Sequence, residues 1–98
     1  MTPEKLRQIY GNPSPRAAAK VISEFDKHCR LFIEQATFLV IASTDGQDLD
    51  VSPKGDLAGF VEVESDKTLL LPDRPGNNRI DGMMNILANS KVALIFII

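Results

Sequence analysis

The chain has 98 residues, of which 44% are hydrophobic and 24% charged, a composition typical of one small soluble globular domain. Eleven Lys and Arg residues against thirteen Asp and Glu residues give a net charge of -2, which argues against a broad nucleic-acid interface. One cysteine and one histidine exclude an internal disulfide framework and an ordinary zinc site, so we expect no bound metal. The longest apolar run is too short to cross a bilayer, and the charged N-terminus differs from a secretory signal. We therefore expect a cytoplasmic protein that does not contact membranes.

The first third of the chain is expected to be helical. Pro3 to Tyr10 can form a short helix with Thr2 as N-cap, and a second helical turn is expected over Ala17 to Ile22. A stronger pattern predicts a helix over Glu24 to Gln35, because Ser23 and Asp26 resemble a capping box. Its apolar stripe is expected to pack on the rest of the protein through Phe25, Phe32 and Ile33.

Beyond residue 36 the hydrophobic period changes from helical to extended. Five strands are predicted, over Phe38–Ala42, Leu49–Pro53, Phe60–Glu64, Thr68–Leu71 and Val92–Ile98. The tight turns between the first four predict antiparallel pairing. A short amphipathic helix with Ile80, Met83, Met84 and Leu87 on its buried side is expected before the last strand, capped by Asn77 or Asn78.

The last strand ends the chain without a turn residue or a polar tail. Chain ends are usually solvated, so we expect a chain truncated at its C-terminus or a strand that needs a partner. The alternative is a natural terminal strand inside a sheet. The apolar last strand and the small core also predict a homodimer or a higher oligomer, because one chain of this size hardly covers its apolar surface.

Two segments carry the residues of a candidate anion site. The loop Pro72 to Arg79 precedes a helix whose first amides lack intrahelical partners, and Arg79 is expected in the first turn of that helix. A cation there opposes the helix dipole unless an anion lies between them, which favours a phosphate. Ser52 and Lys54 share one face of a strand and can also hold phosphate oxygens. The alternatives are a solvated arginine and a solvent-facing turn.

The sequence offers few other sites for chemistry. His28 and Cys29 are neighbours on a helix and point in different directions, so they cannot bind one atom together, and we expect His28 to be exposed and Cys29 to lie in the core. No motif typical of a nucleophile or a common nucleotide fingerprint is present. The acidic residues look scattered, so the catalytic residues are unknown.

Several runs in combination resemble the pyridoxamine 5'-phosphate oxidase-like family of FMN-binding split barrels. The resemblance covers nearly all of the chain and rests above all on the loop PDRPGNNR, residues 72–79. The other runs are Phe38–Gly46, Asp50–Asp56 and Asn85–Phe96, with a lead-in, Leu6–Gly11, that is similar to one uncharacterised subgroup. The chain stops near the fifth of about six strands expected for this family, so the substrate-binding residues of its true oxidases are not matched.

The resemblance implies a mainly β fold of the α+β class, an antiparallel split β-barrel with N-terminal helices and one short helix before the last strand. It implies a single, incomplete domain over residues 1–98, with a helical lead-in at 1–36 and barrel strands at 37–98. It also implies a homodimer with FMN at the interface, and cofactor-binding positions at Ser52, Lys54, Asp73, Arg74, Asn77, Asn78 and Arg79.

The leading hypothesis is therefore an FMN-dependent oxidoreductase of unknown substrate, a flavoprotein in which the cofactor carries the hydride chemistry. The first alternative is a non-catalytic module that binds flavin or another cofactor, and the second is a ligand-free dimerisation domain. A deazaflavin or haem in place of FMN also stays open, because one fold can host several cofactors.

Overall fold

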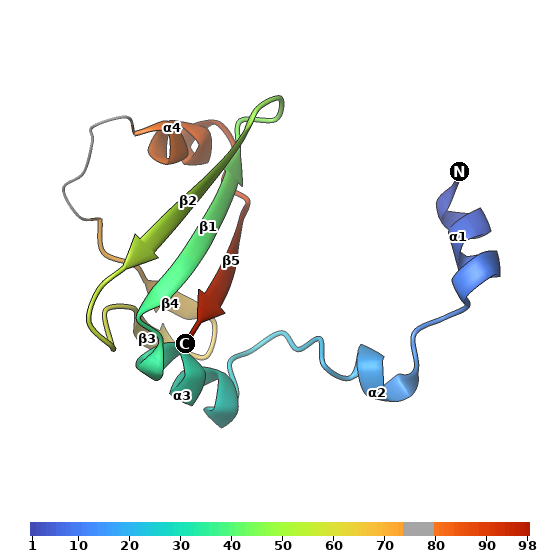
Figure 1. Cartoon of the computed structure of the whole chain (residues 1–98), viewed down its shortest axis with the longest axis horizontal. Coiled ribbons are helices and arrows are strands. Elements are labelled where there is room, and N and C mark those ends of the chain that lie inside the picture. Colours follow the sequence, from blue (N-terminus) through green and yellow to red (C-terminus); the bar gives the residue numbers. More distant parts are fainter. Residues whose placement is uncertain (74–79) are drawn as a thin grey trace.

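The computed structural model describes residues 1–73 and 80–98 (Figure 1). Helices and strands follow in the predicted succession, with a helical lead-in, four strands, a helix and a final strand. Their bounds are α1 Pro3–Tyr10, α2 Pro15–Ala18, α3 Lys27–Gln35, β1 Phe38–Thr44, β2 Leu49–Gly55, β3 Glu62–Ser65, β4 Thr68–Leu70, α4 Asp81–Ala88 and β5 Val92–Ile97.

The five strands form two antiparallel sheets. Strand β1 lies between β2 and β5, and β3 pairs with β4 as a separate hairpin. The antiparallel pairing predicted from the tight turns is confirmed for β1 with β2 and for β3 with β4. Among the described residues the strands do not close into a barrel, so the split barrel and the domain limits at 1–36 and 37–98 stay predictions.

The core lies between the sheets and α3. Leu39 on β1 is fully buried, and together with Ile33 and Val61 it forms the centre of this core. Partly buried apolar side chains surround the centre, namely Phe25, Ile41, Phe60, Val63, Leu69, Leu71, Leu94 and Phe96. The alternation of β1 places Leu39 and Ile41 on the same side of the sheet, which we call the inner face.

Helix α3 begins later than predicted and has a different cap. Asp26 is its N-cap, and its carboxylate accepts a hydrogen bond of 2.8 Å from the backbone N–H of Cys29. The capping box that starts at Ser23 is therefore wrong, because Asp26 itself supplies the cap three residues further on. The packing through Phe25 and Ile33 is confirmed, whereas Phe32 is 45% exposed and contributes little to the core.

The root of α3 is tied to the turn between β3 and β4. The backbone N–H of Phe25 donates to the carbonyl of Asp66 at 2.7 Å, and the Arg30 guanidinium pairs with the Asp66 carboxylate. Lys67 in the same turn lies 3.7 Å from Glu24. These contacts join the β3–β4 hairpin to the helix and its N-terminal flank. His28 is exposed and Cys29 is half-buried.

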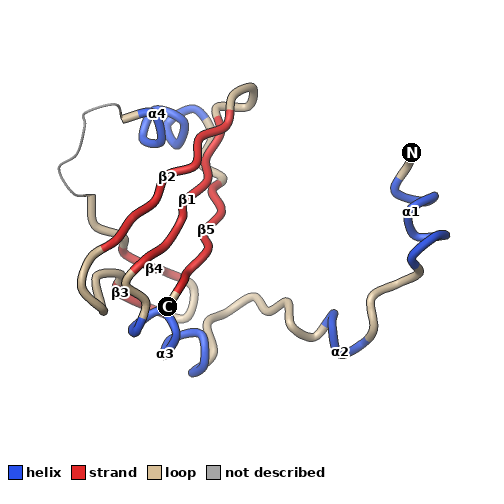
Figure 2. The backbone as a smooth tube through the Cα atoms, viewed as in Figure 1, coloured by secondary structure: helices blue, strands red, loops and turns tan. Residues whose placement is uncertain are grey.

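Residues 1–24 form an arm that leaves the rest of the protein, which we call the body. Helix α1 has the predicted N-cap, Thr2, and Pro3 in its first turn, whereas α2 covers Pro15–Ala18 instead of the predicted Ala17–Ile22, with Ser14 as its cap. Neither helix has a buried residue. Figure 2 shows both helices on one side of the picture, separated from the strands by loop.

Helix α4 differs from its prediction in both its start and its orientation. It begins at Asp81 with Ile80 as N-cap, so the predicted cap at Asn77 or Asn78 and the predicted first turn at Arg79 are wrong. Ile80 adopts a left-handed φ of 54°, which is strained for a β-branched residue. The predicted apolar side is exposed, including Met83 and Met84, which are therefore not core residues.

Strand bounds differ from the predictions by one or two residues at several ends. The largest functional difference is in β2, which continues through Lys54 to Gly55, where a loop was predicted. Strand β3 begins at Glu62 and not at Phe60, although Phe60 still packs against the core. The longer β2 fixes Lys54 on a regular strand opposite Leu39.

The N-cap of α3 makes a first prediction about pH dependence. Hydrogen bonds from the backbone of Cys29 lower the pKa of the Asp26 carboxyl below its ordinary value of 3.8. The stabilisation is thus complete above that ordinary value and is lost as the pH falls through the lowered pKa. We expect Asp26→Ala to melt at a lower temperature than wild type at pH 7, with a difference that shrinks in acid.

The matched control is Asp26→Asn, since asparagine caps helices as well as aspartate does but does not titrate. Its advantage over Asp26→Ala in thermal unfolding followed by circular dichroism should stay constant over the same pH range. A wild-type advantage over Asp26→Ala that persists unchanged into strong acid would contradict the assignment.

Candidate functional site

Strand β2 presents a row of polar side chains to the inner face of the sheet. Ser52 lies opposite Ile41 and Lys54 lies opposite Leu39, both partners being inner-face residues of β1. Both polar residues are half-buried, while Val51 and Pro53 between and beside them are exposed. The prediction that Ser52 and Lys54 share one face of the strand is confirmed.

Asp50 belongs to the same row and occupies the hydroxyl of Ser52. The Ser52 Oγ donates a hydrogen bond of 2.8 Å to Asp50 Oδ2. The Ser52 hydroxyl, which would donate a hydrogen bond to an anion bound at Ser52, therefore already donates to Asp50. An incoming phosphate must displace Asp50 from this hydroxyl or bind to Lys54, two residues further along β2.

Helix α4 rests on this polar end of the inner face. Asn85 donates from Nδ2 to the Oγ of the buried Ser43 at 3.2 Å. A Cβ placed on Gly82 would meet Asp50 Oδ2 at 3.5 Å and Ser43 Oγ at 3.8 Å, so the helix backbone lies close to both side chains. The half-buried side of α4 thus carries Gly82 and Asn85, and its apolar side faces away.

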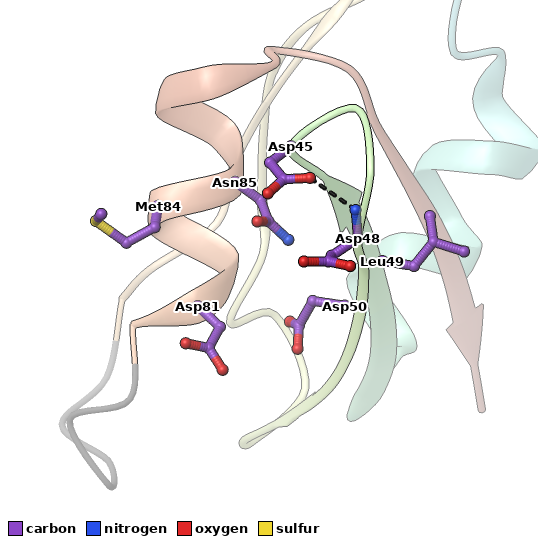
Figure 3. Close-up of a pocket in the computed structure, with 7 residues that line it drawn as sticks. All are labelled: Asp45, Asp48, Leu49, Asp50, Asp81, Met84 and Asn85. Carbon is purple, nitrogen blue, oxygen red and sulfur yellow. Dashed lines mark hydrogen bonds between the residues drawn. The ribbon is translucent and has the colours of Figure 1, made fainter.

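A pocket lies where the β1–β2 turn approaches α4 (Figure 3). It has a volume of about 320 Å³ and is lined by Asp45, Asp48, Leu49, Asp50, Asp81, Met84 and Asn85. In Figure 3 the carboxylates of Asp50 and Asp81 point into the space between the strand and the helix. The expectation that the acidic residues are scattered is wrong, because the hairpin and the first turn of α4 gather four of them.

The charge of this pocket is negative at neutral pH. Hydrogen bonds from the backbone N–H groups of Asp48 and Gln47 lower the pKa of the Asp45 carboxyl, and both donate to its Oδ1, at 2.7 and 2.8 Å. Carboxylates of this kind repel a phosphate at close range. The pocket therefore does not fit the phosphate of a flavin, whereas Lys54 places a positive charge toward the other end of β2.

The remaining predicted positions follow β4. Asp73 is exposed and lies in the segment that leaves β4 after Leu71 and Pro72. Arg74, Asn77, Asn78 and Arg79 lie outside the described residues. The structure thus brings Ser52 and Lys54 together, and it leaves the proposed grouping with the other five positions untested.

Sequence reasoning missed the contacts of Asp50, Ser43 and Asn85. The alternation along β2 already placed Asp50 on the same side as Ser52, which was the available signal. The partners of Asp50 and Ser43 across the sheet and on α4 depend on strand register and helix orientation, which no local pattern contains.

Comparison with known proteins identifies the family. Residues 25–98 match the family model described as pyridoxamine 5'-phosphate oxidase. The chain belongs to this pyridoxamine 5'-phosphate oxidase family. No curated protein and no solved structure matches the chain significantly. The family is flavin-binding, oxidoreductase-like and typically dimeric, and the match begins at Phe25, where the arm ends.

Two other kinds of feature are absent from the described part of this family member. Among residues 1–73 and 80–98 there is no group of three or more His, Cys, Asp or Glu side chains placed to hold a metal ion. Within the same described ranges no helix has the length and the apolar character needed to span a membrane.

The seating of α4 on the sheet gives a second prediction. Asn85→Ala removes the donor to the buried Ser43 hydroxyl, so it should lower the free energy of unfolding by about 1–3 kcal/mol. Chemical denaturation at 25 °C measures this loss. Leu87→Ala on the same helix is the control, because its exposed side chain should change stability by less than about 0.5 kcal/mol. Equal losses for the two variants would show that the hydrogen bond does not hold α4.

Proposed function

We propose that this member of the pyridoxamine 5'-phosphate oxidase family is an FMN-dependent oxidoreductase that acts as a homodimer in the cytoplasm. The observation that carries the proposal is the family match over residues 25–98. The substrate is not specified by any described residue.

Lys54 is the described residue best placed to bind the cofactor phosphate. Its ammonium group is carried by a paired strand, and the half-buried surroundings weaken competition from water. Ser52, Asp73, Arg74, Asn77, Asn78 and Arg79 complete the proposed set. Bound FMN would supply the hydride chemistry, and the role of these side chains is to fix its position.

The acidic pocket makes the two ends of β2 differ in charge, and this difference indicates at which end a phosphate binds. Asp45, Asp48 and Asp50 surround the hairpin end of β2, while Lys54 lies toward the opposite end of the strand. A phosphate is repelled by the first group and attracted by the second. We infer that the phosphate binds at the Lys54 end and that Asp50 restrains the hydroxyl of Ser52 until the cofactor arrives.

The visible spectrum of the purified protein tests the cofactor. We expect absorbance bands of oxidised flavin and their bleaching by NADH or NADPH under anaerobic conditions. Flavin bands that no nicotinamide donor bleaches would support the binding module in place of an oxidoreductase. A colourless protein that does not take up added FMN would favour the ligand-free dimerisation domain.

The phosphate site makes a third, quantitative prediction. Lys54→Ala and Arg79→Ala each remove a charge-assisted contact, so each should weaken FMN binding by about ten- to a hundredfold in a flavin fluorescence titration. Lys27→Ala is the matched control, because Lys27 is an exposed cation on α3. FMN affinity equal to that of the parent in either variant would remove that residue from the site.

Asp50→Asn provides the opposite test on the same strand. It removes the carboxylate that accepts the Ser52 hydrogen bond, and with it about 1 kcal/mol of repulsion toward a nearby anion. FMN binding should become about fivefold tighter. Tighter binding supports a phosphate that binds at the Lys54 end and is repelled by Asp50. Weaker binding would contradict this and show that Asp50 contacts the cofactor.

A further inference from the structure

Besides the apolar side of α4, two apolar surfaces have no partner among the described residues. The first is the outer face of the three-stranded sheet, the side of β1, β2 and β5 that points away from the core. Val51 is 64% exposed and Ile95 is 63% exposed on this face. Its other apolar side chains are Phe38, Val40, Leu49 and Ile97.

The second apolar surface belongs to the arm. Leu6, Ile9 and Tyr10 lie at offsets of zero, three and four along α1, so they share one side of this helix. Ile9 is 63% exposed and Tyr10 is 80% exposed. Helix α1 lies away from the sheet of its own chain (Figure 1). An amphipathic helix this short gains its stability mostly from packing, so the apolar side needs a surface.

The charges of the arm and of the body are complementary. Residues 1–24 contain four basic and two acidic residues, while residues 25–98 contain seven basic and eleven acidic residues. Lys5 and Arg7 flank Leu6 on α1. Asp45 and Asp48 lie in the β1–β2 turn next to Leu49, where they also line the acidic pocket beside α4. An arm laid on this face brings opposite charges together around apolar contacts.

We propose that the arm of one copy docks with α1 on the outer sheet face of a second copy. The proposal rests on the proposed homodimer and adds how its two chains hold each other. Direct stacking of two outer faces would cover the sheets but leave Leu6, Ile9 and Tyr10 in water. Exchange of the arms covers both apolar surfaces at once, and exchange of an element between copies is a low-cost route to a dimer.

Cysteine crosslinking between copies tests the exchange. In a Cys29→Ala background, a chain with Ile9→Cys is mixed with a chain carrying Val51→Cys and oxidised. We expect a disulfide-linked heterodimer, identified by mass spectrometry, because each copy holds only one of the two thiols. Mixing Ile9→Cys with Lys27→Cys is the control, and this pair should not crosslink.

Sedimentation equilibrium of the full chain gives an independent readout. Ile9→Asp should raise the dimer dissociation constant by about tenfold or more, whereas Gln8→Asp, on another side of α1, should not. A dimer whose dissociation constant is unchanged by Ile9→Asp and that yields no crosslink overturns the exchange of arms but not the homodimer. A monomer at micromolar concentration overturns both. A third variant carries both Ile9→Cys and Val51→Cys in one chain. If it forms only an intrachain disulfide, the arm folds back on its own sheet, which also overturns the exchange.

Discussion

Strand β1 is the element on which the rest of the body depends, because it is paired on both edges. Its inner face is apolar at Leu39 and Ile41 and polar at Ser43, and this change of character divides the molecule. The apolar end collects the hairpin β3–β4 and α3 into the core. The polar end receives α4 through Asn85. One strand therefore sets both the position of the core and the position of the candidate site.

The polar end explains the orientation of α4. Ser43 is buried and needs a hydrogen-bonding partner, and Asp50 needs a small neighbour that leaves it room. Asn85 and Gly82 meet these needs, so the helix turns its polar and small side inward and leaves Met83 and Met84 outside. The apolar periodicity of α4 predicts the opposite orientation, with the methionines buried. It considers only the hydrophobicity of the helix and not the polar surface of the sheet on which the helix packs.

Local chemistry was enough to predict most elements, the antiparallel pairing and the shared face of Ser52 and Lys54. Local chemistry did not predict the outcome where two residues could serve the same role or where a contact depends on the fold. Asp26, not Ser23, caps α3, and the preceding Phe25 is bonded to Asp66, a tertiary contact that no nearby pattern reveals. The hydrogen bond from Ser52 to Asp50 could be guessed from their spacing, whereas the gathering of Asp81 with the hairpin carboxylates required the fold itself.

The register of the central strand also has a consequence for the order of folding. Strand β1 meets β2 across a short turn, but Phe38 meets Ile97 only after nearly the whole body has been enclosed. A hairpin forms in about 1–10 μs, and closing a longer loop costs more chain entropy. The β1–β2 hairpin therefore forms early, with one edge of β1 still open. Until β5 arrives, that edge can pair with a strand from any neighbouring chain, so refolding yield should fall as protein concentration rises.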